Sequence, residues 1–249
     1  MNVPEAPLLE ITQVFKSFQG LVAVAGASLQ VREGQIVGLI GPNGAGKTTL
    51  FNTVCGFFKP DSGRITFEGR DLIGLKPHEI CRRGVVRTFQ IVKPFGHLTV
   101  FENVAVGAFN RHRNPCDVED KAGSILEFVG LAKKAQDPAL SLTIPDRKRL
   151  ELARALATEP RLLLLDEVMA GLNPTEKDEM VALVKRIRQS GISVLIIEHS
   201  MRAIMSLCDN IVVLDYGVKI AEGGPETIST DPLVIEAYLG KDHGTAYRV

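Results

Sequence analysis

The chain has 249 residues, which is enough for one large domain or for a core with a subdomain. Its 29 Lys and Arg residues balance 29 Asp and Glu residues, so the formal net charge is zero. This balance excludes the strong basic excess that is typical of nucleic-acid surfaces, and we interpret the basic residues at 133–134 and 147–149 as solvated helix faces.

The longest apolar tracts are strand-sized, so any membrane role must be peripheral. The four cysteines are far apart and lack C-x-x-C spacing, which predicts reduced thiols in a cytosolic protein.

The first part of the chain is expected to form a small β layer. After a leader that contains Pro4 and Pro7, the segments 8–15, 23–31 and 63–68 have the composition of strands. Several of these strands come before the helix-rich middle of the chain. They therefore predict a separate layer near the N-terminus.

A glycine-rich segment at 41–48 matches the pattern G-x-x-x-x-G-K-S/T, which is typical of loops that wrap nucleotide phosphates. The segment consists of Gly41, Pro42, Asn43, Gly44, Ala45, Gly46, Lys47 and Thr48. Its glycines let the backbone turn tightly, so that N–H groups can point at a polyanion. Lys47 would reach the β- and γ-phosphates, and the Thr48 hydroxyl would hold Mg²⁺. We therefore predict that residues 41–49, which end at Thr49, bind Mg-ATP.

The context of this loop supports the same interpretation. The segment 34–40 before it has the pattern of a buried strand, and 48–54 after it begins a helix. A phosphate at that helix N-terminus would meet the positive end of the helix dipole. The alternative is an ordinary glycine-rich turn, but the full pattern seldom arises by chance.

The remaining chain changes from helices to alternating strands and helices. Prolines and glycines divide helical pieces such as 118–129 within the region 91–136, which predicts a helical subdomain. Further on, continuous apolar runs predict parallel strands that are buried on both faces, at 162–165, 193–197 and 211–214. Helices are expected at 176–189 and 201–207. Thr175 is the expected N-cap of the first of these helices, and Gly191 is expected to end it.

Two carboxylates directly follow the four leucines at 162–165. A buried strand that ends in Asp166 and Glu167 places both at the carboxyl edge of the sheet, where ligands bind in open α/β folds. Asp166 could hold Mg²⁺ directly or through water, and Glu167 could act as a general base on the attacking water. Such a pair is about as often a helix N-cap as a catalytic pair. Downstream of a phosphate loop, the catalytic interpretation is favoured.

Two further polar residues follow predicted strands. His199 comes after the strand at 193–197 and should face the same ligand edge, where it could donate a hydrogen bond to the γ-phosphate. A lone histidine in that place is more often structural. Gln90 follows the segment 85–89 and could contact Mg²⁺ or its water. Without the other motifs, a surface glutamine would be the favoured interpretation.

Together these motifs resemble the ATP-binding subunits of ABC transporters, in order and in spacing, over about residues 8–240. The resemblance implies an α/β fold in which a P-loop NTPase core, shared with RecA-like ATPases, carries an antiparallel β subdomain and a helical subdomain at about 91–157. Residues 1–7 and 241–249 would be tails. An aromatic residue of the first strands stacks on adenine in this family; Phe18 matches it best, Phe15 competes, and a plain core role remains open for both.

A closer resemblance is to the ATPase subunits of branched-chain amino-acid importers, whose relatives serve other hydrophobic amino acids, amides and urea. It rests on the segments 85–90, 170–174, 197–201 and 235–240. The Tyr-Leu-Gly ending is also similar to the lipopolysaccharide-export ATPase. A soluble ABC-type ATPase that acts on nucleic acid or ribosomes is a further alternative, although those usually carry coiled-coil insertions or two modules. The order of the motifs argues against a plain P-loop kinase or GTPase.

The resemblance also implies partners. Two such domains would sandwich two ATP molecules head to tail, so a second ATPase subunit, identical or different, is expected. Transmembrane permease subunits and, indirectly, a substrate-binding protein would complete the transporter, with this chain on the cytoplasmic face of the membrane. No nucleic-acid partner is expected.

The signature segment departs from the family pattern. The family has L-S-G-G-Q where this chain has Leu-Thr-Ile-Pro-Asp at 142–146. Thr143 can replace the serine hydroxyl, but Pro145 replaces a glycine whose N–H would face the γ-phosphate of the partner's ATP, and proline has no N–H. Asp146 adds a carboxylate near phosphate. The change is either tolerated drift within a subfamily or the mark of a weak half-site. Val168, where proline is usual, is a milder departure.

Overall fold

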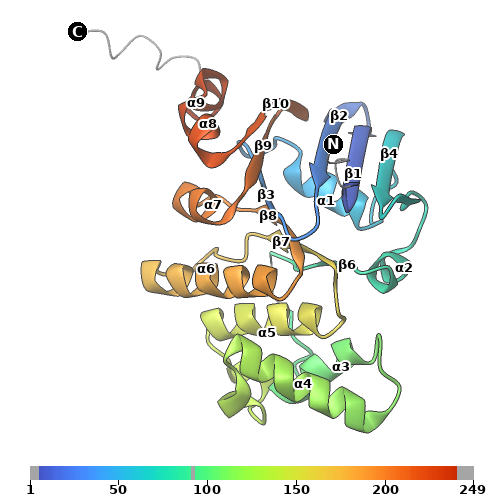
Figure 1. The fold of residues 1–249 in the computed structure, drawn as a ribbon, viewed down its shortest axis with the longest axis vertical. Coiled ribbons are helices and arrows are strands. Elements are labelled where there is room, and N and C mark those ends of the chain that lie inside the picture. The colour runs from blue at the N-terminus through green and yellow to red at the C-terminus, as the bar shows by residue number, and fades with distance from the viewer. Residues whose placement is uncertain (1–5, 91–92, 240–249) are drawn as a thin grey trace, which may run out of the picture. The chain divides into compact units, whose positions relative to one another are not determined.

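The structure is a computed structural model that describes residues 6–90 and 93–239. The chain divides into two compact units (Figure 1). The first contains residues 1–77 and 193–249, and the second contains residues 78–192.

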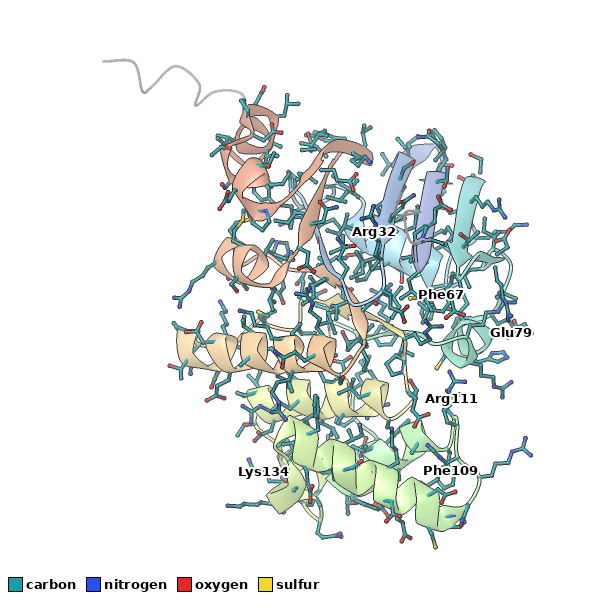
Figure 2. All side chains as sticks on the ribbon, viewed as in Figure 1. Arg32, Phe67, Glu79, Phe109, Arg111 and Lys134 are labelled. Atoms are coloured by element: carbon teal, nitrogen blue, oxygen red, sulfur yellow. The ribbon has the colours of Figure 1, made fainter. Side chains whose placement is uncertain are left out.

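An antiparallel sheet forms part of the first unit. Its strands are β1 (Leu9–Phe18), β2 (Leu21–Val31), β4 (Ser62–Phe67) and β5 (Arg70–Asp71), in the order β2-β1-β4-β5. Figure 1 shows β1, β2 and β4 side by side, as their pairing requires. Its strands bury aliphatic side chains and Phe67, which is labelled in Figure 2. The predicted antiparallel β subdomain is confirmed.

The first unit also contains parallel strands. They are β3 (Ile36–Ile40), β8 (Ser193–Ile197) and β9 (Asn210–Asp215), with β3 between the other two. Strand β10 (Val218–Gly223) pairs antiparallel with β9. Every residue of β3 and β8 is buried, which explains why these strands are continuous apolar runs. The helices of this unit are α1 (Lys47–Val54), α7 (Met201–Leu207), α8 (Pro225–Thr230) and α9 (Pro232–Leu239).

The second unit contains two parallel strands, β6 (Val85–Arg87) and β7 (Leu162–Asp166). Its helices are α2 (Pro77–Arg82), which begins at the boundary of the unit, α3 (Val100–Ala108), α4 (Pro115–Val129), α5 (Ile144–Leu156) and α6 (Pro174–Gln189), with short 3₁₀ turns η1 (Ala132–Lys134) and η2 (Ala139–Ser141). Helices α3, α4 and α5 contact one another. They lie where a helical subdomain was predicted, while its boundaries at about 91–157 stay a prediction.

One predicted helix boundary is wrong. Helix α6 begins at Pro174, and Asn173 is its N-cap instead of Thr175. The Asn173 side chain accepts a hydrogen bond from the Glu176 N–H at 3.0 Å, and the Glu176 carboxylate accepts one from the Asn173 N–H at 2.8 Å. The fixed φ of proline suits the first helical position, so the cap must precede it. Gly191 follows the last turn with φ of 92°, as predicted.

The four cysteines are free, as their spacing predicted. Within residues 6–90 and 93–239, no helix is both long enough and apolar enough to cross a membrane.

Candidate nucleotide site

The phosphate-loop segment connects β3 to α1 in the first unit. Gly41 has φ of 149° and Gly46 has φ of 95°, which disfavours any residue with a side chain. A Cβ atom would lie 2.0 Å from the Leu214 carbonyl oxygen at Gly41, and 2.2 Å from the Ala23 carbonyl oxygen at Gly46. Both glycines are therefore required by conformation and by the close approach of neighbouring backbone.

Lys47 lies inside this loop. Its side chain is only 6% exposed, and its Nζ donates hydrogen bonds to the carbonyl oxygens of Gly41 at 2.7 Å and Pro42 at 2.9 Å. The ammonium is thus held across the loop at the start of α1, where the helix dipole also favours an anion. Thr48 is exposed and Thr49 is half-buried in the first turn of α1. This geometry suits phosphate binding, and the individual roles stay predictions.

The hydroxyl of Tyr238 also meets the loop. It accepts a hydrogen bond from the Gly41 N–H at 2.8 Å. Partial burial raises the pKa of Tyr238 above its ordinary value and the Gly41 N–H opposes this shift, while the residue keeps 42% of its surface exposed. No local sequence pattern predicts this contact, because Tyr238 lies 197 positions from Gly41 and follows no phosphate-binding pattern.

His199 follows β8, which pairs in parallel with β3. The phosphate loop follows β3, so His199 and the loop lie at the same carboxyl edge of the sheet, where we expected both. The side chain of His199 is exposed. Its γ-phosphate role stays a prediction.

Two aromatic candidates for adenine stacking lie in β1. Phe18 is 39% exposed; its ring is edge-on to Phe58 with 5.0 Å between centroids, and Lys16 Nζ lies 5.2 Å from its centroid. The Phe15 ring packs closely over Gly26, where an added Cβ would lie 3.0 Å away. Both rings keep exposed area. Adenine stacking on Phe18, with Phe15 as its competitor, stays a prediction.

In the second unit, two predicted site residues are brought together. The Gln90 amide Nε2 donates a hydrogen bond to Glu167 Oε2 at 2.5 Å. Glu167 has φ of 49°, a conformation that residues other than glycine seldom adopt. Strained backbone of this kind clusters at functional sites.

Asp166, the last residue of β7, is paired with a buried arginine. Its carboxylate lies 2.5 Å from Arg87 of the adjacent strand β6, and its side chain is about 3% exposed. Its backbone N–H donates to the Thr88 hydroxyl at 3.2 Å. The carboxylate oxygens of Asp166 are the kind of ligand that a hard cation prefers.

Lys148 was interpreted from the sequence as part of a solvated helix face, and this is wrong. It is 6% exposed, and its Nζ donates to the carbonyl oxygens of Gln90 at 3.1 Å and Glu167 at 3.3 Å. One turn further along α5, Glu151 is also buried and accepts a hydrogen bond from the Phe89 N–H at 2.5 Å. The spacing of residues 148, 151, 152 and 155 along one helix face was the signal that could have revealed this burial.

The unusual signature segment forms the start of α5. Thr143 is the N-cap residue and Pro145 lies in the first turn. The Thr143 hydroxyl donates to Asp146 Oδ2 at 2.8 Å, and the Lys134 ammonium, labelled in Figure 2, pairs with the same carboxylate. Burial opposes ionisation of Asp146, but these two partners outweigh it and lower its pKa. Lys134 is therefore an ion-pair partner, which the solvated-face interpretation missed.

Comparisons with known proteins show which family this chain is similar to. The ABC transporter family model matches residues 24–170, and the model of the branched-chain amino acid ATP-binding cassette transporter matches residues 218–244. The high-affinity branched-chain amino acid transport ATP-binding protein BraF of Pseudomonas aeruginosa is 43% identical over 252 residues, with 94% of this chain and 98% of BraF covered. LivG of Escherichia coli K12, with the same description, is 41% identical, with the same coverage. The ADP conformation of MJ1267, an ATP-binding cassette of an ABC transporter, superimposes with a TM-score of 0.86 at 33% identity, covering 95% of this chain and all of MJ1267.

Proposed function

Because the chain belongs to the ABC transporter family and is an ATP-hydrolysing cassette of that family, we propose that it energises the uptake of branched-chain or other hydrophobic amino acids or related amides. The observation that carries this proposal is the similarity to BraF and LivG over nearly the whole length of both chains. The family match at 218–244 supports it independently. Both observations favour uptake over lipopolysaccharide export or a soluble role.

Residues 41–49 bind ATP in this proposal. Lys47 supplies the cation for the β- and γ-phosphate oxygens, and the loop N–H groups supply further donors. Phe18 stacks on adenine, with Phe15 as its competitor. His199 donates a hydrogen bond to the γ-phosphate.

Mg²⁺ would be held by Thr48 and Asp166, with Gln90 near it or its water. These residues fit a hard cation, since a hydroxyl, an amide and the carboxylate that pairs with Arg87 can each supply an oxygen ligand. When bound, the ion would offset the negative charge of the phosphate oxygens.

Glu167 performs the proton transfer in hydrolysis. Its carboxylate takes a proton from a water molecule, whose oxygen bonds to the γ-phosphorus while the bond to the β,γ-bridging oxygen breaks, which yields ADP and phosphate. The hydrogen bond from Gln90 and the ammonium of Lys148 on the Glu167 carbonyl orient this base. The departing oxygen leaves with the electron pair of the broken bond.

The chain acts with partners in this proposal. It is one ABC-type domain at 8–240, with a helical subdomain at about 91–157 and tails at 1–7 and 241–249. It docks peripherally on the cytoplasmic face of the cell membrane, against transmembrane permease subunits. A second ATPase subunit, identical or different, and indirectly a substrate-binding protein complete the transporter. No nucleic acid takes part.

The test is co-purification of the chain with its permease subunits, followed by ATP-driven uptake of labelled leucine into vesicles. We expect leucine uptake that valine and isoleucine inhibit. If the vesicles took up neither these amino acids nor amides, the proposed substrate class would be overturned.

Lys47→Ala should abolish tight ATP binding, because it removes the cation of the loop. Lys59→Ala, on an exposed residue, is the matched control. Unchanged ATP affinity in Lys47→Ala would overturn the assignment of the loop.

A further inference from the structure

The first residue of the phosphate loop is held from two sides within the first unit. On one side the carbonyl of Leu214 in β9 approaches so closely that a Cβ at Gly41 would lie 2.0 Å from its oxygen. On the other side the Gly41 N–H donates to the hydroxyl of Tyr238 at 2.8 Å. Tyr238 belongs to α9, which contacts α8 and β10 (Figure 1). The last described helix of the chain therefore reaches the beginning of the loop.

We propose that Tyr238 is a positioning residue for ATP, because its hydroxyl fixes the first N–H of the phosphate loop and so sets the loop conformation. The inference rests on the proposed binding of ATP by residues 41–49. It assigns the Gly41 N–H to support of the loop, which leaves phosphate binding to the donors that come later in it. It also makes α9 part of the nucleotide site, although α9 itself contacts no phosphate in this proposal.

A cavity lies next to this hydrogen bond. A cavity of about 430 Å³ lies between the loop residues 42–45 and the α9 side chains of Leu233, Glu236 and Ala237. Where such a space separates two segments, few dispersion contacts resist a shift of one against the other. The hydrogen bond from Gly41 to Tyr238 connects the loop to α9 beside this space, so its loss should change the conformation of the loop.

The chemistry of tyrosine suits this role. A neutral phenol oxygen accepts one N–H without bringing a negative charge next to the phosphates. The ring attaches the hydroxyl through only two rotatable bonds, so little conformational entropy is lost in holding it. A phenylalanine would keep the ring and leave the buried N–H of Gly41 without its acceptor.

The test is Tyr238→Phe in the full chain. We expect ATP to bind about 3- to 10-fold more weakly, which corresponds to the loss of one ordinary neutral hydrogen bond. The melting temperature should fall by about 2–4 °C for each kcal/mol that the lost hydrogen bond costs, and the Gly41 amide should exchange its hydrogen with solvent faster than in the wild type. Tyr216→Phe is the matched control, because Tyr216 lines the same cavity but is 86% exposed in the turn between β9 and β10. It should bind ATP as the wild type does.

Each outcome separates this inference from the proposed function. Wild-type ATP affinity in Tyr238→Phe overturns the positioning role, whether or not the melting temperature falls. If Lys47→Ala loses ATP binding in the same assay, the proposal that residues 41–49 bind ATP still holds, and only the positioning role of Tyr238 is overturned. Should Tyr238→Phe fold poorly, 3-fluorotyrosine at position 238 keeps the ring and hydroxyl but offers a weaker acceptor oxygen. Weaker ATP binding then supports the inference, and unchanged binding overturns it.

Discussion

The side-chain amide of Gln90 donates a hydrogen bond to the carboxylate of Glu167, with 2.5 Å between Nε2 and Oε2. The two residues follow β6 and β7, which pair in parallel. Lys148 donates to the carbonyl oxygens of both residues and so ties them together at the backbone as well. A substitution of Gln90 or of Lys148 should therefore alter the orientation of the Glu167 carboxylate.

Glu167→Gln should separate ATP binding from hydrolysis. The amide keeps the shape of the carboxylate but cannot take a proton from water, and a positioned general base contributes about 10²- to 10⁴-fold to rate. ATP binding should stay close to wild type while single-turnover phosphate release falls at least about 100-fold. Glu119→Gln, on an exposed residue of α4, is the control. Wild-type turnover in Glu167→Gln would place the base elsewhere.

Gln90→Ala should lower hydrolysis and transport more than ATP binding. It removes a hydrogen bond to a charged group, which corresponds to about 10- to 100-fold in rate if the full interaction serves the base. The measurement compares ATP affinity, ATPase rate and leucine uptake in the reconstituted transporter. An equal loss of all three would contradict a role in coupling.

Lys148→Met should destabilise the second unit and slow hydrolysis. Methionine keeps most of the length of the side chain, but it leaves the carbonyl groups of Gln90 and Glu167 without this donor, at a cost of about 1–3 kcal/mol. Urea unfolding gives the free energy, and phosphate release gives the rate. Lys133→Met, on an exposed lysine, should change neither quantity. Equal stability of the two variants would show that the buried ammonium has no structural role.

The free energy of unfolding should depend on pH because of the Glu151 carboxyl group. Burial raises the pKa of its carboxyl above the ordinary value of 4.5, although the Phe89 N–H and nearby lysine and arginine charges oppose this shift. The folded state therefore holds the proton more tightly than the unfolded state. This contribution to stability is largest below pH 4.5 and falls as the pH rises towards the raised pKa. Glu151→Gln keeps an acceptor for Phe89 and should remove this fall from the unfolding free energy measured by urea between pH 4 and 8.

Pro145→Gly combined with Asp146→Gln should raise ATP hydrolysis by the site that this signature faces on the second ATPase subunit. The double change restores an N–H donor, worth about 2.7–4 kcal/mol by comparison with one oxyanion-hole donor, and removes a carboxylate. The ATPase rate of the reconstituted complex measures the effect, with the general base of each subunit changed in turn to separate the two sites. Unchanged activity, or equal loss from both single-base variants, would contradict unequal sites.

Most strands and the phosphate loop could be predicted from the sequence, because their signals are local. The apolar run at 193–197 and the helix at 201–207 have the bounds of β8 and α7. The glycines, the lysine and the threonine of the phosphate loop likewise lie within the eight residues 41–48. Such features depend on the chain's own periodicity and turn chemistry.

What the sequence missed depends on contacts between distant residues. Lys148 and Glu151 carry charges that are solvated on most helices, and only the neighbouring strand ends make their burial favourable. The hydroxyl of Tyr238 reaches Gly41 through the packing of α9, which no local pattern encodes. Asn173 replaces Thr175 as the helix cap because Pro174 occupies the first helical position.

The ion pair between Lys134 and Asp146 restricts the order in which mutations can accumulate at the signature. Loss of Lys134 alone would leave a largely buried carboxylate with less compensation, while loss of Asp146 alone would leave Lys134 and the Thr143 hydroxyl without this shared partner. The two positions are therefore expected to be epistatic, each substitution being tolerated better after the other. A lineage that acquired this pair would return to a glycine-rich signature through less stable intermediates, so its signature can persist even when selection on the half-site is weak.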